Sequence, residues 1–200
     1  MKQLTIVDKK SAALAFVIQK HATIRSHYDF RLQVGRVMPS WAIPKGPTLD
    51  PGAKRLAMQT PDHDLEYRHF EGTIPEGSYG AGTVMIWDAG TYIAEIEIEK
   101  GKREQVEDKK EAQKVMKAGL KKGELKFQLL GSKVRGSFAL IKTRGFGPKN
   151  SWLLIKHKDE YVQEGYDANA YNFSASTKRT LAEISQADTG RKNEVFRSLH

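Results

Sequence analysis

The amino-acid sequence predicts an all-β domain of antiparallel strands, a barrel or a sandwich, with one inserted helix and a partly helical C-terminal tail. Short runs rich in β-branched and aromatic residues recur along the chain and are separated by Gly and Pro, which is the pattern of antiparallel strands. One stretch near the middle is rich in Glu, Lys, Gln and Ala instead. The 200 residues can fill one core and do not require two.

Ten segments carry the strand pattern, and that many strands in one domain favour a barrel or a sandwich. In chain order they are residues 16–21, 27–34, 40–43, 55–60, 70–74, 82–87, 91–98, 124–130, 134–142 and 152–158. Trp41, Trp87 and Trp152 each fall in one of these segments, so we expect them in the core rather than stacked on nucleic-acid bases.

A helix is expected over residues 103–120, with Gly123 at its end. Its apolar stripe consists of Ala112, Val115, Met116 and Leu120. The glycine-dense segment 74–84 lacks the Gly-Lys-Ser/Thr ending of a phosphate-binding loop, so it is expected to form tight turns. A second, short helix is expected near residues 179–187.

The chain divides into an N-terminal arm (1–15), one domain (16–160) and a C-terminal tail or linker (161–200). No apolar run approaches the roughly 20 residues needed to cross a bilayer, and the first residues lack the apolar core of a secretory signal. We therefore expect a cytoplasmic protein. The sequence has no cysteine, so any metal must be held by His, Asp, Glu or water.

The net charge of +9 favours a polyanionic partner, and the excess lies in the second half of the chain. Residues 1–99 carry 11 basic and 12 acidic side chains, whereas residues 100–200 carry 22 and 12. The candidates for contacts to a DNA backbone are Lys126, Lys133, Arg135, Lys142 and Arg144. The alternative is a solvated basic surface that only aids solubility.

An unusual polar alternation runs through residues 20–33, KHATIRSHYDFRLQ. Successive side chains of a strand point to opposite faces. One face of the expected strand carries His27, Asp29, Arg31 and Gln33, and the other carries Tyr28, Phe30, Leu32 and Val34. A solvated sheet face explains the polarity, but not two histidines, an aspartate and an arginine within so short an interval.

A hairpin loop over residues 22–26 would place His21 opposite or diagonal to His27, where cross-strand side chains meet. Together with Asp29 they form a three-ligand set with open positions, as a catalytic divalent metal requires. Mn²⁺, Zn²⁺ and Fe²⁺ all suit such ligands.

Arg31 lies on the same face, two residues beyond Asp29. A guanidinium beside a metal is repelled unless an anion lies between them, and phosphate takes a bidentate arginine contact. The pair of metal and arginine therefore indicates a phosphate ester; the alternative is a plain ion pair of Arg31 with Asp29. Further polar candidates, each of which could also be merely solvated or structural, are Gln19, Lys45, Arg55, His63 and Tyr67.

These residues stand in motifs that resemble a known family, the 3'-phosphoesterase module of the DNA ligase D type of end-joining ligases and its free-standing relatives. The matching motifs, in the order of the family, are FVIQKH, HYDFRL, SWAIPKGP, KRLAM, DHDLEY, FEGTIPEGSYGAGTVMIWDAGTY, GSFALIKT and SWLLIKHKDEY. They span residues 16–161, which is most of the chain.

The resemblance implies a β-barrel of antiparallel strands with the polar site in a curved cavity. It implies a divalent metal, typically manganese, on His21, His27 and Asp29. The phosphate-binding and catalytic residues would be Arg31 and His63 with Tyr67, and the supporting contacts Gln19, Lys45 and Arg55. The implied activity is removal of a terminal 3'-ribonucleoside and of the remaining 3'-phosphate at DNA or DNA/RNA primer-template ends. The implied setting is DNA repair in the prokaryotic cytosol or nucleoid, with a separate ATP-dependent DNA ligase as a partner.

The sequence departs from the family pattern at two places, and the first of them favours phosphate removal over ribonucleoside removal. Relatives commonly carry an Arg-Asp pair and a following Glu in the N-terminal arm that assist the ribonucleoside step, and residues 1–15 lack the pair. Many relatives also have a carboxylate where Pro61 stands here. Ligase D proteins continue into ligase or polymerase modules. We expect this chain to be a free-standing form of the phosphoesterase module, although STKRTLAEIS resembles the linker that follows the module in longer relatives.

Two other classes of function stay open from the residues alone. A non-haem iron oxygenase also uses two histidines and a carboxylate, and it would require iron and a keto acid. A non-catalytic nucleic-acid-binding barrel could hold a structural metal on the same residues.

Overall fold

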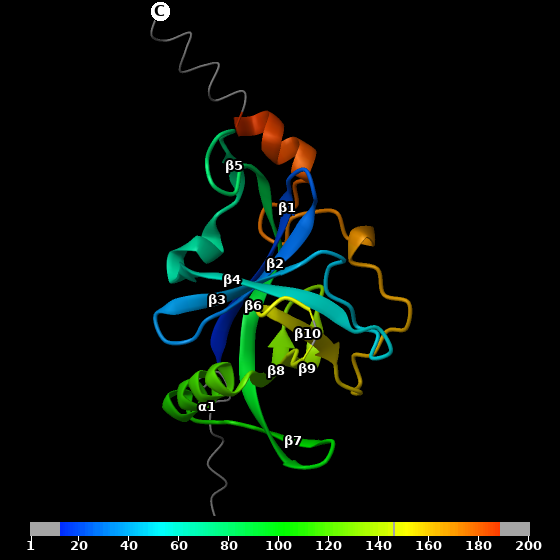
Figure 1. Ribbon diagram of the computed structural model, residues 1–200. Helices are drawn as coiled ribbons and strands as arrows, with labels where there is room; N and C mark the ends of the chain where they lie inside the picture. Colours follow the sequence, from blue (N-terminus) through cyan, green and yellow to red (C-terminus); the bar gives the residue numbers. More distant parts are fainter. Residues whose placement is uncertain (1–12, 146, 189–200) are drawn as a thin grey trace, which may run out of the picture.

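The computed structural model describes residues 13–145 and 147–188, which form a closed antiparallel β-barrel of eight strands (Figure 1). The hydrogen-bonded neighbours follow the order β1-β2-β3-β4-β10-β9-β8-β6, and pairing of β1 with β6 closes the ring. The barrel strands are β1 (Leu14–Ala22), β2 (His27–Leu32), β3 (Val37–Ile43), β4 (Arg55–Asp64), β6 (Gly82–Glu99), β8 (Glu124–Leu130), β9 (Arg135–Lys142) and β10 (Ser151–Lys156). The predicted antiparallel barrel is thereby confirmed.

Smaller elements lie outside the ring of strands. They are β5 (Gly72–Ile74) and β7 (Lys102–Gln105), which pair with β6, the helix α1 (Lys109–Lys122), the 3₁₀ segments η1 (Leu65–His69) and η2 (Ala168–Ala170), and a helix over residues 181–188. None of the helices within the described residues is both long and apolar enough to cross a membrane.

Large apolar side chains fill the interior of the barrel. Trp41, Trp87 and Trp152 are at most 1% exposed, which confirms their prediction as core residues. The rings of Trp41 and Trp152 meet edge to face at a centroid distance of 5.6 Å, and Phe127 stacks on Phe138. The side chains that pack in this core are apolar, whereas the polar side chains of β1 and β2 alternate with them and point to the outer face of the sheet.

The sequence pattern placed the start of the central helix too early. Residues 103–105 belong to β7, where Arg103 pairs with Glu97 and Gln105 with Glu95 of β6. This strand pairing overrides the helical composition of the segment. Asp108 caps the true N-terminus, its side chain accepting from the backbone of the third helical residue, and the predicted end at Gly123 is confirmed by its left-handed φ of 82°.

The predicted strands 82–87 and 91–98 are one continuous strand, β6. Gly90 lies between the two predicted segments, and here the backbones of β6 and β8 approach closely. A Cβ at Gly90 would lie 2.3 Å from the carbonyl oxygen of Leu130 on β8. Strand β1 already begins at Leu14, so the end of the expected N-terminal arm belongs to the barrel, while residues 1–12 lie outside the described residues.

The described part of the expected tail, residues 161–188, packs against the barrel. Tyr166 and Ile184 are buried in the main core, and Trp87 Nε1 donates a 2.7 Å hydrogen bond to the carbonyl of Tyr171. The short helix expected near residues 179–187 is confirmed at 181–188. This segment is therefore part of the folded unit.

Asp88→Ala should lower the free energy of unfolding by about 3 kcal/mol, because the lost carboxylate leaves buried donors unsatisfied. Asp88 is fully buried, and its two oxygens accept from the backbone N–H groups of residues 132–134 in the β8–β9 turn. As a comparison, Asp108→Ala removes an exposed helix cap and should cost about 1 kcal/mol. Urea unfolding of both variants measures the difference, and equal losses would contradict the structural role of Asp88.

Candidate active site

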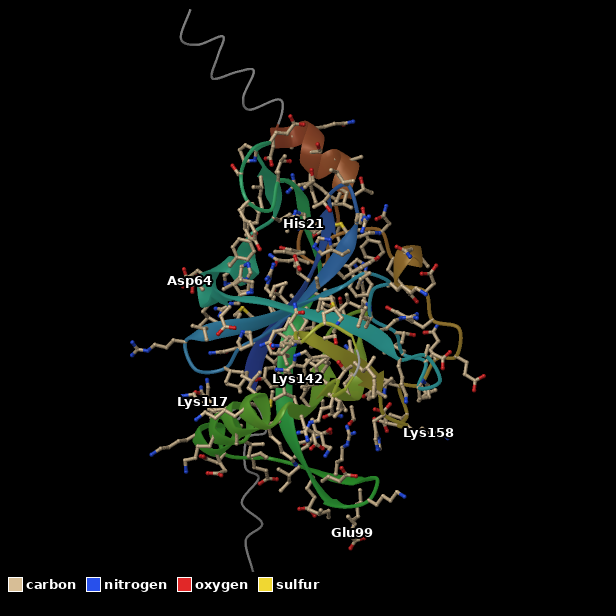
Figure 2. The ribbon with its side chains drawn as sticks, in the orientation of Figure 1. His21, Asp64, Glu99, Lys117, Lys142 and Lys158 are labelled. Atoms are coloured by element: carbon tan, nitrogen blue, oxygen red, sulfur yellow. The ribbon has the colours of Figure 1, made fainter. Side chains whose placement is uncertain are left out.

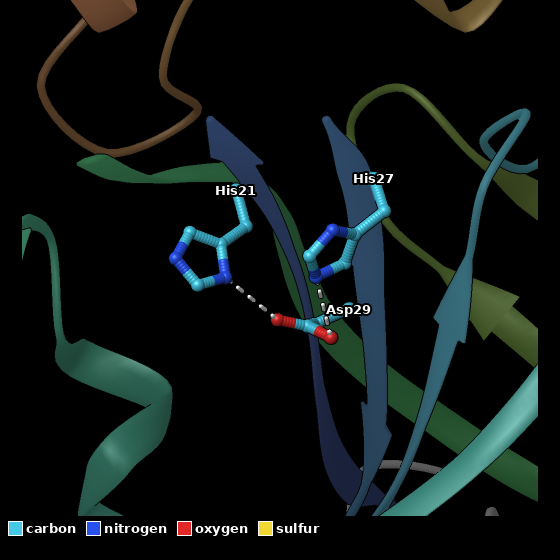
Figure 3. Close-up of side chains that lie close together, drawn as sticks. All are labelled: His21, His27 and Asp29. Atoms are coloured by element: carbon cyan, nitrogen blue, oxygen red, sulfur yellow. Dashed lines mark ion pairs between the residues drawn. The ribbon is translucent and has the colours of Figure 1, made fainter. Parts of the chain in front are cut away.

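The β1–β2 hairpin brings His21, His27 and Asp29 together as the alternation predicted. His21 lies directly opposite His27 in the strand register. Asp29 Oδ2 is 3.7 Å from His21 Nδ1, and Asp29 Oδ1 is 3.6 Å from His27 Nε2 (Figure 3). One potential ligand atom from each residue lies within 4.8 Å of the others.

These three side chains fit a divalent metal in both spacing and chemistry. Atoms that bind one ion at about 2.1 Å lie roughly 3 to 3.5 Å from one another, close to the separations seen here. His27 Nδ1 lies 3.0 Å from the carbonyl of Arg25, so this nitrogen can donate while Nε2 keeps its lone pair toward Asp29. His21 Nε2 is buried and has no hydrogen-bond partner among the described residues.

The Asp29 carboxylate stays ionised in this setting. Burial alone raises its pKa, but the interaction with His21 and the positive charge of Arg31 together outweigh burial, so the pKa lies below its usual value. A buried carboxylate that keeps its charge is a strong ligand for a hard or borderline cation. The hairpin therefore presents a preformed anionic ligand.

Arg31 is fixed on the other side of Asp29. Its Nη2 donates to Asp29 Oδ2 at 3.1 Å, and its Nε donates to Gln19 Oε1 at 2.7 Å. The guanidinium also lies over the ring of Tyr67, 5.0 Å from the centroid, a cation–π contact. Arg31 is 3% exposed, so its orientation is set before any ligand arrives.

Gln19 connects Arg31 to the η1 segment through hydrogen bonds. Its amide nitrogen donates to the carbonyls of Tyr67 and Phe70, at 3.1 and 2.9 Å. Both residues belong to the η1 segment or directly follow it. Gln19 is fully buried, so it holds the outer face of the hairpin and η1 in one arrangement and acts as a positioning residue.

His63 of β4 completes the polar cluster. Its Nδ1 lies 3.0 Å from the carbonyl of Pro61 and 3.0 Å from Arg31 Nη1, and its Nε2 lies 3.3 Å from the same arginine nitrogen. A neutral ring suits both partners, since Nδ1–H can donate to Pro61 while Nε2 accepts from Arg31. Burial and the adjacent charge of Arg31 lower the pKa of His63, which favours this neutral form.

All of these side chains except the fully buried Gln19 open into one cleft of about 440 Å³ on the outer face of the barrel. Its lining includes the three hairpin residues, Arg31, His63 and Tyr67, and also Thr60 and Tyr79. Figure 2 shows His21 at the end of the molecule opposite Glu99 of the β6–β7 hairpin. The polar face of the hairpin thus lines a cavity outside the barrel, whose interior is apolar.

Sequence reasoning missed Thr60 and Tyr79. Thr60 lies two residues before Asp62 on β4, and its hydroxyl is buried without a hydrogen-bond partner among the described residues. Tyr79 belongs to the glycine-dense segment, where it follows Ser78 and precedes Gly80. An aromatic residue amid glycines was the available signal, since tight turns alone do not require one.

Several predicted contacts lie away from the cleft. Lys45 is an exposed residue of the β3–β4 connection, and Arg55 at the start of β4 pairs with Leu154 of β10. Neither lines the cleft, so nothing in its geometry supports them as phosphate contacts.

The five candidates for DNA-backbone contacts differ in their exposure and in their partners. Lys133 is buried, and its ammonium group donates to the carbonyls of Trp87 and Phe173. It is therefore engaged inside the fold, where it anchors the C-terminal segment. Lys126 is paired with Glu97 and Glu124. The exposed members of the set are Arg135, Lys142 and Arg144.

Comparisons with known proteins point to one family. The model of the DNA Ligase D 3'-phosphoesterase domain matches residues 19–142, which contain every residue of the cluster. The multifunctional non-homologous end joining protein LigD of Pseudomonas aeruginosa is 44% identical over 146 residues, 73% of this chain and 15% of that protein. The LigD of Mycobacterium tuberculosis, named a non-homologous end joining DNA repair protein, is 37% identical over 169 residues, 84% of this chain and 19% of that protein. The chain thus spans less than a fifth of these relatives.

Gln19→Leu should lower the free energy of unfolding by about 2 to 3 kcal/mol, because it leaves Arg31 Nε and two carbonyls without partners in a buried place. Gln33→Leu is the matched control: it lies on the same outer face but is half-buried, and its side chain accepts one bond from Ala15 N. That variant should cost about 1 kcal/mol or less. Urea unfolding decides, and equal costs would contradict the positioning role of Gln19.

Proposed function

This chain belongs to the DNA ligase D 3'-phosphoesterase family, and from that premise we propose that it is a metal-dependent hydrolase that removes phosphate from DNA 3' ends. One observation carries the proposal. His21, His27 and the ionised Asp29 converge at the wall of a cleft, and Arg31 forms an ion pair with the same aspartate. The products are inorganic phosphate and a 3'-hydroxyl that a ligase can use.

His21, His27 and Asp29 would hold the metal, and manganese is the ion we propose for this mixed nitrogen and oxygen set. When bound, a divalent ion neutralises phosphate charge and lowers the pKa of water. The hydrolysis breaks the bond between phosphorus and the 3' oxygen; water supplies a hydroxyl to the phosphate and a proton to the departing oxygen. The cleft excludes bulk water from one side of the ester.

Arg31 is proposed to bind non-bridging oxygens of the phosphate. Its Nη1 and Nη2 each carry two hydrogens, and the contacts to His63 and Asp29 leave donors free to face the cleft. Because the guanidinium is held before the ester binds, its charge stabilises the transition state without a cost of reorganisation. Burial raises the pKa of Tyr67, so its hydroxyl stays protonated and can donate to a phosphate oxygen.

His63 is proposed to act as a neutral group beside Arg31. A lowered pKa makes it a poor general acid near neutral pH, so it serves better by accepting from Arg31 and keeping the guanidinium aimed at the ester. We therefore propose that His63 stabilises the transition state and does not protonate the leaving oxygen.

The biological setting follows from the relatives, whose names place them in non-homologous end joining and DNA repair. We propose that this chain heals 3' ends for a DNA ligase in the same process. Ribonucleoside removal is a separate proposal, since residues 1–15 lack the Arg-Asp pair that is expected to assist it; residues 1–12 lie outside the described residues.

His27→Ala should reduce phosphate release from a 3'-phosphorylated primer-template by about 100-fold or more, because the site loses one of its three ligands. His157→Ala, which removes a half-buried histidine from a loop after β10, is the matched control and should retain full activity. Release is measured with and without manganese. A second substrate, with a single 3'-terminal ribonucleotide, tests the ribonucleoside step.

Several outcomes of that assay would overturn the proposal. Release that does not need a metal, or full release by His27→Ala, contradicts the metal centre. Duplex binding without any product from the wild-type protein indicates a non-catalytic barrel. Turnover that needs ferrous iron and a keto acid, with no phosphate released, indicates an oxygenase.

The exposed basic residues are proposed to contact phosphates of the duplex. Lys142→Ala with Arg144→Ala should reduce the slope of log affinity against log salt concentration by about 2, one for each lost phosphate contact. Lys100→Ala with Lys102→Ala removes equal charge from the β6–β7 hairpin and should leave the slope unchanged. Fluorescence anisotropy at several salt concentrations measures both. Equal slopes for all variants would show that residues 142 and 144 do not touch the duplex.

A further inference from the structure

Tyr79 stands out as a large aromatic side chain that the molecule leaves in water. It is 91% exposed, yet it lines the cleft together with His21 and Arg31. Within the described residues no hydrogen bond or ring contact engages it. Burial of an exposed aromatic ring is favourable, so a ligand that covers Tyr79 would gain binding free energy.

The loop that carries Tyr79 is held close to the ligand hairpin. Gly80 lies against the His21 ring, since a Cβ at Gly80 would be 3.9 Å from His21 Cε1. Gly82 approaches the backbone of Ala22 so closely that a Cβ would lie 2.3 Å from its carbonyl oxygen. A side chain at position 82 would clash with that backbone, and the left-handed φ of 75° at Gly80 favours glycine there, so the position of Tyr79 is tied to the β1–β2 hairpin.

A second hollow continues from the cleft past this loop. It has a volume of about 760 Å³ and shares Thr23 with the cleft. Its walls are the tip of the β1–β2 hairpin and the β5–β6 connection, and they include Ile24, which is fully exposed. The charged residues Arg25 and Glu76 also line this hollow, but most of its lining surface is apolar, which suits a ligand whose anionic part is joined to a flat apolar part.

We propose that Tyr79 stacks on the base of the 3'-terminal nucleoside while the phosphate of that nucleoside lies against Arg31. This inference rests on the proposed function and deepens it by assigning a nucleoside subsite to the β5–β6 connection. A nucleotide matches the two adjoining surfaces, polar in the cleft and apolar beside it. Stacking tolerates any base, because every base has a π face, so the subsite would select a nucleoside end without reading its sequence.

The test compares a primer-template that ends in a 3'-phosphorylated nucleotide with one that ends in a 3'-phosphorylated abasic residue. Binding is measured by fluorescence anisotropy without added metal, so that ends are not consumed. Tyr79→Ala should weaken binding of the base-bearing end by about 10-fold and leave binding of the abasic end unchanged. Tyr79→Phe should bind both ends as the wild type does, because the ring is kept. Ile98→Ala, an exposed apolar residue of the distant β6–β7 hairpin, is the control.

Equal weakening of both ends by Tyr79→Ala, or no weakening of either, would overturn the stacking site. Loss of base-dependent binding in Tyr79→Phe would also overturn it, since a hydroxyl contact would then be responsible. The same proteins assayed with manganese separate this inference from the proposed function. A wild-type protein that binds in the base-dependent way but releases no phosphate would contradict the hydrolase and support the subsite.

Discussion

The carboxylate of Asp29 is the point on which the architecture of the site depends. Two imidazoles and one guanidinium face it within 3.7 Å, and it is nearly buried. A buried negative charge is costly unless it is paired, so the hairpin register that supplies these partners is strongly specified. A slip of β2 by one residue against β1 would turn His27, Asp29 and Arg31 toward the apolar interior.

The barrel core supports this arrangement from the inner face of the sheet, and the η1 segment supports it from the outer face. On the inner face, Phe30 and Trp41 pack in the main core. On the outer face, Val17, Met38 and Ile86 form a second, smaller cluster with Leu65 of η1. Gln19 links the same two parts through hydrogen bonds. The functional groups are therefore oriented by neighbours on every side, which is what preorganised charge stabilisation requires.

The parts of the site that could be predicted are those encoded locally. A period of two along residues 27–33 and a short loop before them were enough to place both histidines, Asp29 and Arg31 on one face. His63 and Tyr67 were candidates from their residue types, and the family resemblance gave them roles. The place of His63 depends on the pairing of β4 with β3, and Tyr67 follows in η1. Tyr79 was missed because its exposure depends on how the β5–β6 loop meets the hairpin.

Other errors have the same origin in non-local contacts. Lys133 has the composition of a surface residue, but the C-terminal segment folds over it and supplies a carbonyl partner from Phe173. The start of α1 was misjudged because the pairing of β7 with β6 outweighs local helix propensity. Long-range pairing cannot be deduced from spacing in a single sequence, whereas the antiparallel barrel class, the core tryptophans and the end of α1 at Gly123 could be.

The most direct test of the central claim is anomalous diffraction at the manganese edge from crystals grown with manganese. The account predicts a single strong peak within bonding distance of His21, His27 and Asp29, on the cleft side of the hairpin and facing Arg31. No peak at this hairpin, or a peak held by other residues, would contradict the metal centre and with it the proposed chemistry.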